Sequence, residues 1–186
     1  MLSEGIPSKA MPAGPLVRIH VHTRSGSKTR GILRAGTLAY PVALGRGGIR
    51  ANKREGDGGT PRGVFRLKRL WWRQDRVSRP ATVLPVRPIR PEDAWSEDPA
   101  DRRYNRPVRR TPGEPGDRLS RDDGLYDLII EIDHNDRPRI VGRGSAVFIH
   151  VARDGFKPTA GCVALRRNDL LRLLTRLGPK TKIQIH

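Results

Sequence analysis

The sequence has little cysteine, few aromatic residues and no long apolar run. One cysteine stands among 186 residues, and aromatic side chains make up 5% of the chain. A single thiol excludes an intramolecular disulfide, so cysteine content does not indicate the redox compartment. No apolar stretch reaches the roughly 18 residues that a membrane-spanning helix requires, so we expect no membrane span. The first residues, MLSEGIPSKAMPAGPL, also lack the apolar core of a signal peptide.

Acidic residues are scarce relative to basic ones. The chain has 37 lysines and arginines against 19 aspartates and glutamates, for a net charge of +18. Such a charge attracts anions, and nucleic acid is the usual partner of a strongly basic protein. The basic residues are spread along the whole chain with few aromatic residues between them, which argues against a dedicated nucleic-acid reader. We therefore expect no nucleic-acid partner. The competing interpretation is a basic protein whose function is to bind nucleic acid.

The composition and the apolar patterning predict a mostly β domain. The chain has 20 glycines, 16 prolines and a hydrophobic fraction of 35%, and its length suits one domain. Leucines on one helical face predict one main helix near the C-terminus, with Asn168 as its N-cap. We expect a flexible tail over residues 1–15 and a monomeric single domain over 16–186. Strands are predicted over residues 16–23, 29–33, 38–44, 64–72, 125–132, 147–151 and 182–186. The first three of them are expected to form an antiparallel meander.

Two segments between these strands are candidates for a role at a binding site. Residues 45–59 are glycine-rich but match no nucleotide-binding motif, so they either pass close to a substrate or form a solvated hairpin loop. Arg46 and Lys53 in this loop are candidate carboxylate contacts. Residues 80–123 are first proline-rich and then polar. They are predicted to form an extended segment and a long loop, either a surface crossing or a lid.

Two features of the strands invite a functional interpretation. Trp71 and Trp72 point to opposite faces of their strand. One indole is predicted to lie in the core, and the other is a candidate for lining a groove. His20 and His22 share one strand face and are a candidate metal pair, but the sequence indicates no third ligand near them. We therefore expect no metal site.

The stretch from 147 to 165, VFIHVARDGFKPTAGCVAL, combines the groups needed for thiol chemistry. It holds the only cysteine, Cys162, after a buried strand that contains His150. An imidazole can take the proton from a thiol, and Gly161 allows a tight turn in which backbone N–H groups face an oxyanion. The alternative is a buried cysteine and a core histidine without a catalytic role.

This stretch resembles the active-site signature of the YkuD-type L,D-transpeptidases, which remodel bacterial peptidoglycan. Thr60-Pro61-Arg62-Gly63-Val64-Phe65 resembles the family's upstream Thr-Pro-x-Gly-x-Phe element, and residues 168–185 resemble its helix, turn and closing strand. The resemblance implies a β-sandwich or half-open barrel and places nucleophile and base at Cys162 and His150. Ala160 and Ala164 replace the family's usual second histidine and arginine, and the loop before Cys162 is short.

The implied reaction is a two-step acyl transfer between peptidoglycan stem peptides that requires no cofactor and no metal. Backbone N–H groups of Gly161 and Cys162 would hold the oxyanion. The altered groove favours 1-3 crosslinks at L-Ala over 3-3 crosslinks between diaminopimelates. Hydrolysis of the same thioester, as in a carboxypeptidase or endopeptidase, is an alternative, as is a non-catalytic wall-binding module. The candidate substrate contacts are Thr159, His134, Asn135, Tyr104, Trp95 and Arg46.

The expected partners are the stem peptides and glycan of peptidoglycan. Both lie outside the cytoplasm, so this function predicts a periplasmic or cell-wall location. Because no signal peptide is visible in this chain, that location requires an export segment absent from it or an unrecognised export route. Otherwise the predicted function is wrong.

Overall fold

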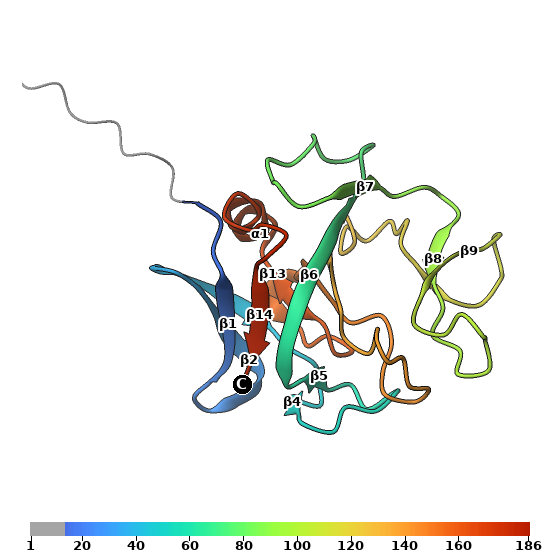
Figure 1. The fold of residues 1–186 in the computed structure, drawn as a ribbon, viewed down its shortest axis with the longest axis horizontal. Coiled ribbons are helices and arrows are strands. Elements are labelled where there is room, and N and C mark those ends of the chain that lie inside the picture. The colour runs from blue at the N-terminus through green and yellow to red at the C-terminus, as the bar shows by residue number, and fades with distance from the viewer. Residues whose placement is uncertain (1–13) are drawn as a thin grey trace, which may run out of the picture.

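The computed structural model describes residues 14–186, and it is mostly β. The main sheet has nine strands in the order β11-β12-β13-β3-β2-β1-β14-β6-β7, and β11 also pairs with β6, so the sheet closes like a barrel and β7 lies outside the ring (Figure 1). Its strands are β1 (Arg18–Arg24), β2 (Ser27–Ala35), β3 (Leu38–Ala43), β6 (Gly63–Trp72), β7 (Val86–Pro88), β11 (Leu128–Ile132), β12 (Phe148–Val151), β13 (Val163–Leu165) and β14 (Lys182–Ile185). The mostly β prediction is confirmed. Of the predicted tail, residues 1–13 lie outside the described part of the chain.

The strands lie close to where alternation predicts them, but their pairing is more mixed than a meander. β1, β2 and β3 pair antiparallel, as expected. The pairs β1–β14, β12–β13 and β6–β7 are parallel. Parallel pairs join segments that are distant in sequence. The antiparallel meander predicted for the first three strands is therefore confirmed, and β6, β11 and β12 also pair antiparallel.

Strand alternation divides the apolar residues between two cores. One core fills the barrel, and the other lies outside it and includes Trp71, Ile129, Phe148 and Cys162. Trp72 belongs to the barrel core, with its neighbour Trp71 in the second core. The two indoles do face opposite sides, and both are buried. Trp71 therefore lines no open groove, because the outer face of the barrel is covered here.

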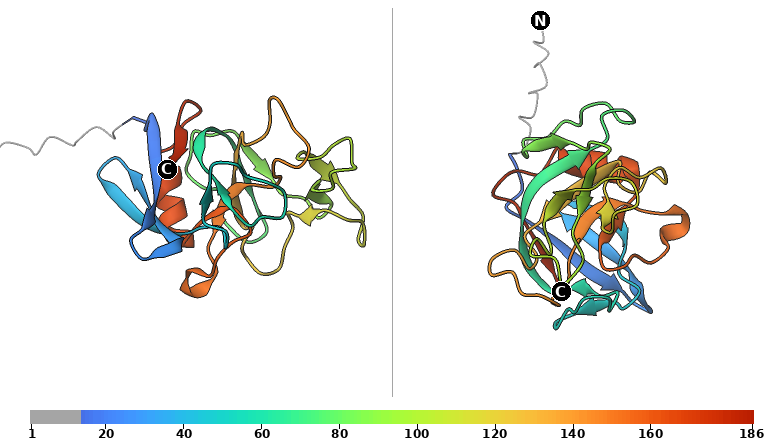
Figure 2. Two further views of the ribbon diagram at one scale, coloured as in Figure 1. Left: turned by 90° about the horizontal axis from the view of Figure 1, so that it is seen from below. Right: turned by 90° about the vertical axis from the view of Figure 1, so that its right-hand side faces the viewer.

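The segment 80–123 forms this cover and is more ordered than the predicted long loop. It contains a three-stranded sheet in the order β10-β8-β9, from β8 (Asp93–Trp95), β9 (Pro107–Arg109) and β10 (Asp117–Arg118). This sheet lies at the end of the molecule opposite β1 and β2 (Figures 1 and 2). Trp95 and Leu119 anchor it in the second core. The loop prediction failed because each strand is too short to give a periodic signal.

One α-helix, α1 (Arg167–Leu174), follows β13 and precedes β14 in the chain (Figure 1). It begins one residue before the predicted N-cap Asn168, and Arg166 occupies the cap position. Leu170, Leu173 and Leu174 are buried in the barrel core, as the helical pattern predicts. Because β14 follows it, α1 is not the last element of the chain. No helix within residues 14–186 has the length and apolar character to span a membrane.

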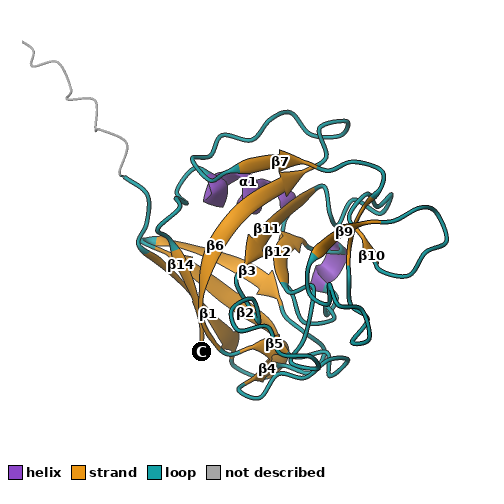
Figure 3. Cartoon of the chain, turned by 45° about the vertical axis from the view of Figure 1, so that its right-hand side comes forward, coloured by secondary structure: helices purple, strands orange, loops and turns teal. Residues whose placement is uncertain are grey.

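Two shorter strands complete the chain near the barrel rim. β4 (Ile49–Arg50) pairs in parallel with β5 (Thr60–Pro61), which begins the Thr-Pro-x-Gly-x-Phe element. This pair closes the glycine-rich loop of residues 45–59 upon itself and fixes it beside the barrel (Figure 3).

Candidate active site

The register of two parallel strands brings Cys162 and His150 to one face of the barrel. Ile149 pairs with Val163, and His150 pairs with Ala164. Continuing this register backward places Cys162 beside Phe148, two residues before His150 on β12. Residues two apart on a strand share a face. The thiol and the imidazole therefore face the second core while Ile149 and Val163 face the first.

The Cys162 thiol is buried and held by backbone groups. The Phe148 N–H donates to Sγ, and Sγ lies 3.3 Å from the Ala146 carbonyl oxygen, to which it donates. Burial raises the pKa of Cys162 to about 12. The resting side chain is therefore a neutral thiol, and forming the thiolate requires an acceptor for its proton.

His150 has the protonation state that such an acceptor requires. Its Nδ1 lies 2.8 Å from the Val151 carbonyl oxygen. A carbonyl can only accept a hydrogen bond, so Nδ1 carries the proton and Nε2 keeps its lone pair. Burial lowers the pKa of His150 to about 4, so the ring is neutral near pH 7. Within the described residues no hydrogen bond joins this ring to Sγ, which instead bonds to Ala146.

The turn before Cys162 is built on two glycines and two threonines. Gly161 has a φ of 147°, and a Cβ there would lie 2.8 Å from the Gly59 carbonyl oxygen. The Thr159 hydroxyl donates to the Cys162 carbonyl oxygen at 2.7 Å and accepts from the Gly161 N–H at 3.1 Å. Gly45 forms a bridge with Thr159 and donates to the buried Thr60 hydroxyl. The glycine-rich loop and the cysteine turn are therefore packed backbone against backbone.

Both side chains line a cavity of about 540 Å³ that carries charges of both signs. Arg46 and Lys53 come from the glycine-rich loop, so this loop does lie beside the site. Lys53 is bound to Asp57 at 2.8 Å, whereas the described residues include no ion-pair partner for the Arg46 guanidinium. The other charged residues in the lining are Glu55, Glu97, Asp117, Arg121, Arg153 and Lys157.

The 80–123 segment supplies one wall of this cavity. Asp117 accepts a hydrogen bond from the Tyr126 hydroxyl at 2.6 Å, and the Tyr126 ring meets the His150 ring edge-on at a centroid distance of 5.3 Å. The Arg121 guanidinium carbon lies over the Tyr126 ring, 4.9 Å from the ring centroid. Burial raises the pKa of Asp117 and raises that of Tyr126 well above its ordinary value. Tyr126 therefore stays protonated and positions the imidazole by packing.

Thr159, Arg46 and Lys53 are the predicted substrate contacts that line the cavity. Trp95 is buried in the second core, and its Nε1 donates a hydrogen bond to Asn105. Its ring therefore packs against other residues of the protein and does not line the cavity. Tyr104 is also buried and donates its hydroxyl proton to Glu55. It therefore reaches the site through Glu55, which does line the cavity.

His134 and Asn135 also lie outside the cavity lining and stabilise a turn. The Asn135 side chain bonds to Ile140 and to the Gly144 carbonyl, and His134 Nε2 lies 3.1 Å from the Arg143 carbonyl oxygen. Phe65 of the Thr-Pro-x-Gly-x-Phe element packs edge-on against the His134 ring. These contacts are local structural ones.

Sequence reasoning missed several residues of the site, among them Glu55, Glu97, Asp117 and Tyr126. Glu55 and Glu97 lie outside the strands, Asp117 begins the two-residue strand β10, and no motif marks any of these carboxylates, whereas Tyr126 falls within a predicted strand. Only the folding of the 80–123 segment over the barrel brings Asp117 to Tyr126. A second omission concerns His186, which lies close to His20 and His22, where the sequence indicated no third histidine.

A buried cysteine and a neutral histidine in one cavity of a β barrel define a candidate thiol-dependent acyl-transfer site. Residues 17–185 match the sequence model of the YkuD family, described as the L,D-transpeptidase catalytic domain. This match covers nearly the whole described chain, and the protein belongs to that family. Its members are generally cysteine-dependent transpeptidases that act on peptidoglycan in the cell wall. No curated protein and no solved structure matches the chain.

Proposed function

We propose that this protein is a peptidoglycan L,D-transpeptidase in which Cys162 is the nucleophile and His150 the general base. The observation that carries this proposal is the protonation pattern of the pair. His150 donates from Nδ1 to Val151 and is neutral, so its Nε2 can accept the thiol proton. Cys162 is a neutral thiol in a buried site and needs such an acceptor.

In the first step, Sγ leaves the Ala146 carbonyl, transfers its proton to His150 Nε2 and attacks a carbonyl of an L-configured residue in a stem peptide. The tetrahedral intermediate collapses to a thioester, and the leaving amine takes the proton from His150. In the second step, the amine of another stem attacks the thioester and releases the thiol. The Gly161 and Cys162 N–H groups hold the oxyanion, which requires Thr159 Oγ1 to release the Gly161 N–H.

The mixed charges of the cavity suit stem peptides that carry both carboxylates and amines. Arg46 is the proposed carboxylate contact, because its guanidinium lines the cavity. Glu55 and Glu97 are proposed to face the incoming amine. The 80–123 segment acts as the wall that narrows the groove, consistent with the predicted lid. We also propose a periplasmic or cell-wall location, because peptidoglycan lies there, and an acyl transfer that needs neither metal nor cofactor.

The shape of the site favours 1-3 crosslinks. Cleavage after L-Ala leaves donor chain on both sides of the reacting carbonyl, so the groove must extend beyond Cys162 in two directions. A second hollow adjoins the cavity and shares Leu125, Arg153 and Lys157 with it.

The test is to incubate purified disaccharide-peptides with the wild-type protein and with Cys162→Ala, followed by tandem mass spectrometry. We expect Cys162-dependent dimers whose fragments place the new bond at L-Ala. Dimers linked between diaminopimelates would refute the 1-3 assignment alone. Cys162-dependent shortening without dimers would show hydrolysis. Identical outcomes for both proteins would refute the mechanism and favour nucleic-acid binding, testable by its salt dependence.

A further inference from the structure

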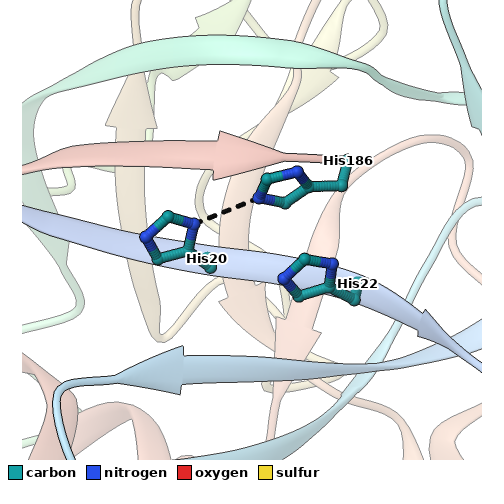
Figure 4. Close-up of side chains that lie close together, drawn as sticks. All are labelled: His20, His22 and His186. Carbon is teal, nitrogen blue, oxygen red and sulfur yellow. Dashed lines mark hydrogen bonds between the residues drawn. The ribbon is translucent and has the colours of Figure 1, made fainter.

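Three histidines from β1 and the end of β14 lie close together (Figure 4). None of them lines the cavity around Cys162. His20 and His22 lie two residues apart on β1 and therefore share a face. β14 pairs in parallel with β1, with His20 beside Gln184 and Val21 beside Ile185. The next residue of each strand is His22 and His186, and the His186 N–H donates to the Val21 carbonyl at 3.0 Å. The sheet thus fixes the backbones of all three.

The imidazole nitrogens lie close enough to share one ion. His20 Nδ1 and His186 Nε2 are 3.1 Å apart. Two nitrogens bound to one tetrahedral Zn²⁺ at about 2.0–2.1 Å are separated by roughly 3.3 Å, so this pair already has the required spacing. One nitrogen from each of the three residues lies within 4.8 Å of the others. Rotation of the exposed His22 side chain closes the remaining gap.

A hydrogen bond within the cluster explains only part of this arrangement. It accounts for His20 and His186, but within residues 14–186 the structure shows no hydrogen bond to the His22 ring. His22 stacks on His186 at a centroid distance of 4.1 Å and an interplanar angle of 10°. The ring nitrogens of His22 are therefore open to a metal ion, and imidazole nitrogens are common metal ligands.

We propose that His20, His22 and His186 form a binding site for one divalent late transition-metal ion, such as Zn²⁺. Imidazole is a preferred ligand of these metals, and three imidazoles leave a fourth position for water at this surface. Arg34, which pairs with His20 across β1 and β2, opposes a cation electrostatically. The ion would join β1 to its parallel neighbour β14. This site shares no residue with the cavity around Cys162 and is independent of the proposed function.

The test uses the untagged Cys162→Ala chain, because its only thiol would otherwise bind the same metals. Zn²⁺ alone is titrated calorimetrically into this protein and into versions that also carry His22→Ala or His186→Ala. We expect one Zn²⁺ per chain, and affinity at least about 100-fold weaker without either imidazole, since even outer partners of a ligand are worth 10–100-fold. Thr23→Ala, next to His22 on β1, is the matched control and should bind as the parent does.

Two further readouts separate a shared ion from loose surface binding. At 100 times the dissociation constant, Zn²⁺ should raise the unfolding midpoint by about 5–10 °C in the parent and not in His22→Ala. Cu²⁺ in the same site should show nitrogen superhyperfine splitting in its electron paramagnetic resonance spectrum. The proposal would be overturned if the parent failed to bind Zn²⁺, or if His22→Ala and His186→Ala bound it as tightly as the parent.

Discussion

The Gly45 N–H donates a hydrogen bond of 2.8 Å to the fully buried Thr60 hydroxyl. This bond connects the Thr-Pro-x-Gly-x-Phe element to the cysteine turn, because Gly45 also forms the bridge to Thr159. The packing around Gly45 is tight: a Cβ there would lie 2.1 Å from the Gly58 carbonyl oxygen and 3.1 Å from the Gly161 Cα. Two elements about 100 residues apart in sequence, which the family resemblance identifies separately, thus form one structural unit.

Replacing Thr60 with valine should therefore destabilise the protein. The Gly45 N–H would be left buried without a partner, which costs about 1–3 kcal/mol of unfolding free energy. Thr60→Ser keeps the hydroxyl and should retain most of the stability. Urea unfolding of the two variants measures the difference. Equal stability of Thr60→Val and wild type would show that the bond contributes nothing.

Gly161→Ala should lose both stability and acylation. Its φ of 147° disfavours any side chain, and the added Cβ would lie 2.8 Å from the Gly59 oxygen. We expect a loss of about 1–3 kcal/mol in unfolding free energy and a large fall in thioester formation. Gly142→Ala is the control, because Gly142 also has a positive φ but open space around it. If both substitutions cost the same, crowding against Gly59 is not important.

Acid should destabilise the protein through His150. The pKa of His150 is about 4 when folded, below the ordinary value of 6.5, because burial disfavours the charged ring. The unfolded chain then binds more protons between these values, so stability is full above about pH 6.5 and falls as pH decreases toward 4. At pH 5 the loss is about 2 kcal/mol relative to pH 7. Urea unfolding at both pH values should show this for wild type, and a smaller loss for His150→Gln.

Trp95→Ala should act on stability rather than on substrate affinity. The Trp95 ring packs edge-on against Phe148 at a centroid distance of 4.9 Å, and its Nε1 donates to Asn105. Truncation should cost about 3–5 kcal/mol. Trp95→Phe keeps a ring and should cost less. A KM for stem peptide that rises tenfold while unfolding free energy is unchanged would restore the predicted role of Trp95 as a substrate contact.

Arg46→Ala should weaken substrate binding without lowering stability. The side chain lines the cavity, and a charge-assisted hydrogen bond to a carboxylate contributes about 1.5–3 kcal/mol. We expect KM to rise by about tenfold or more, with unfolding free energy changed by less than about 0.5 kcal/mol. Arg62→Ala removes an exposed arginine that lies outside this cavity and serves as the control. An equal effect of both substitutions would point to net charge instead.

The sequence by itself determined the local structure. Alternation predicted β1, and leucine spacing predicted the start of α1, within one or two residues, because the side-chain period follows from backbone geometry. The Gly161-Cys162 pair and His150 were proposed as site residues because they lie within one short stretch. Their local chemistry and the family's motifs sufficed to propose nucleophile and base.

The tertiary structure decided everything that depends on contacts between distant segments. Closure of the barrel through β11 and β6, and the cover formed by residues 80–123, arise from non-local pairing that no local pattern encodes. The protonation states of His150 and Cys162 follow from burial, which is a property of the fold. His186 meets His20 and His22 only because β14 pairs in parallel with β1. Sequence periodicity sets the face on which a side chain lies, whereas strand register decides which side chain lies next to it.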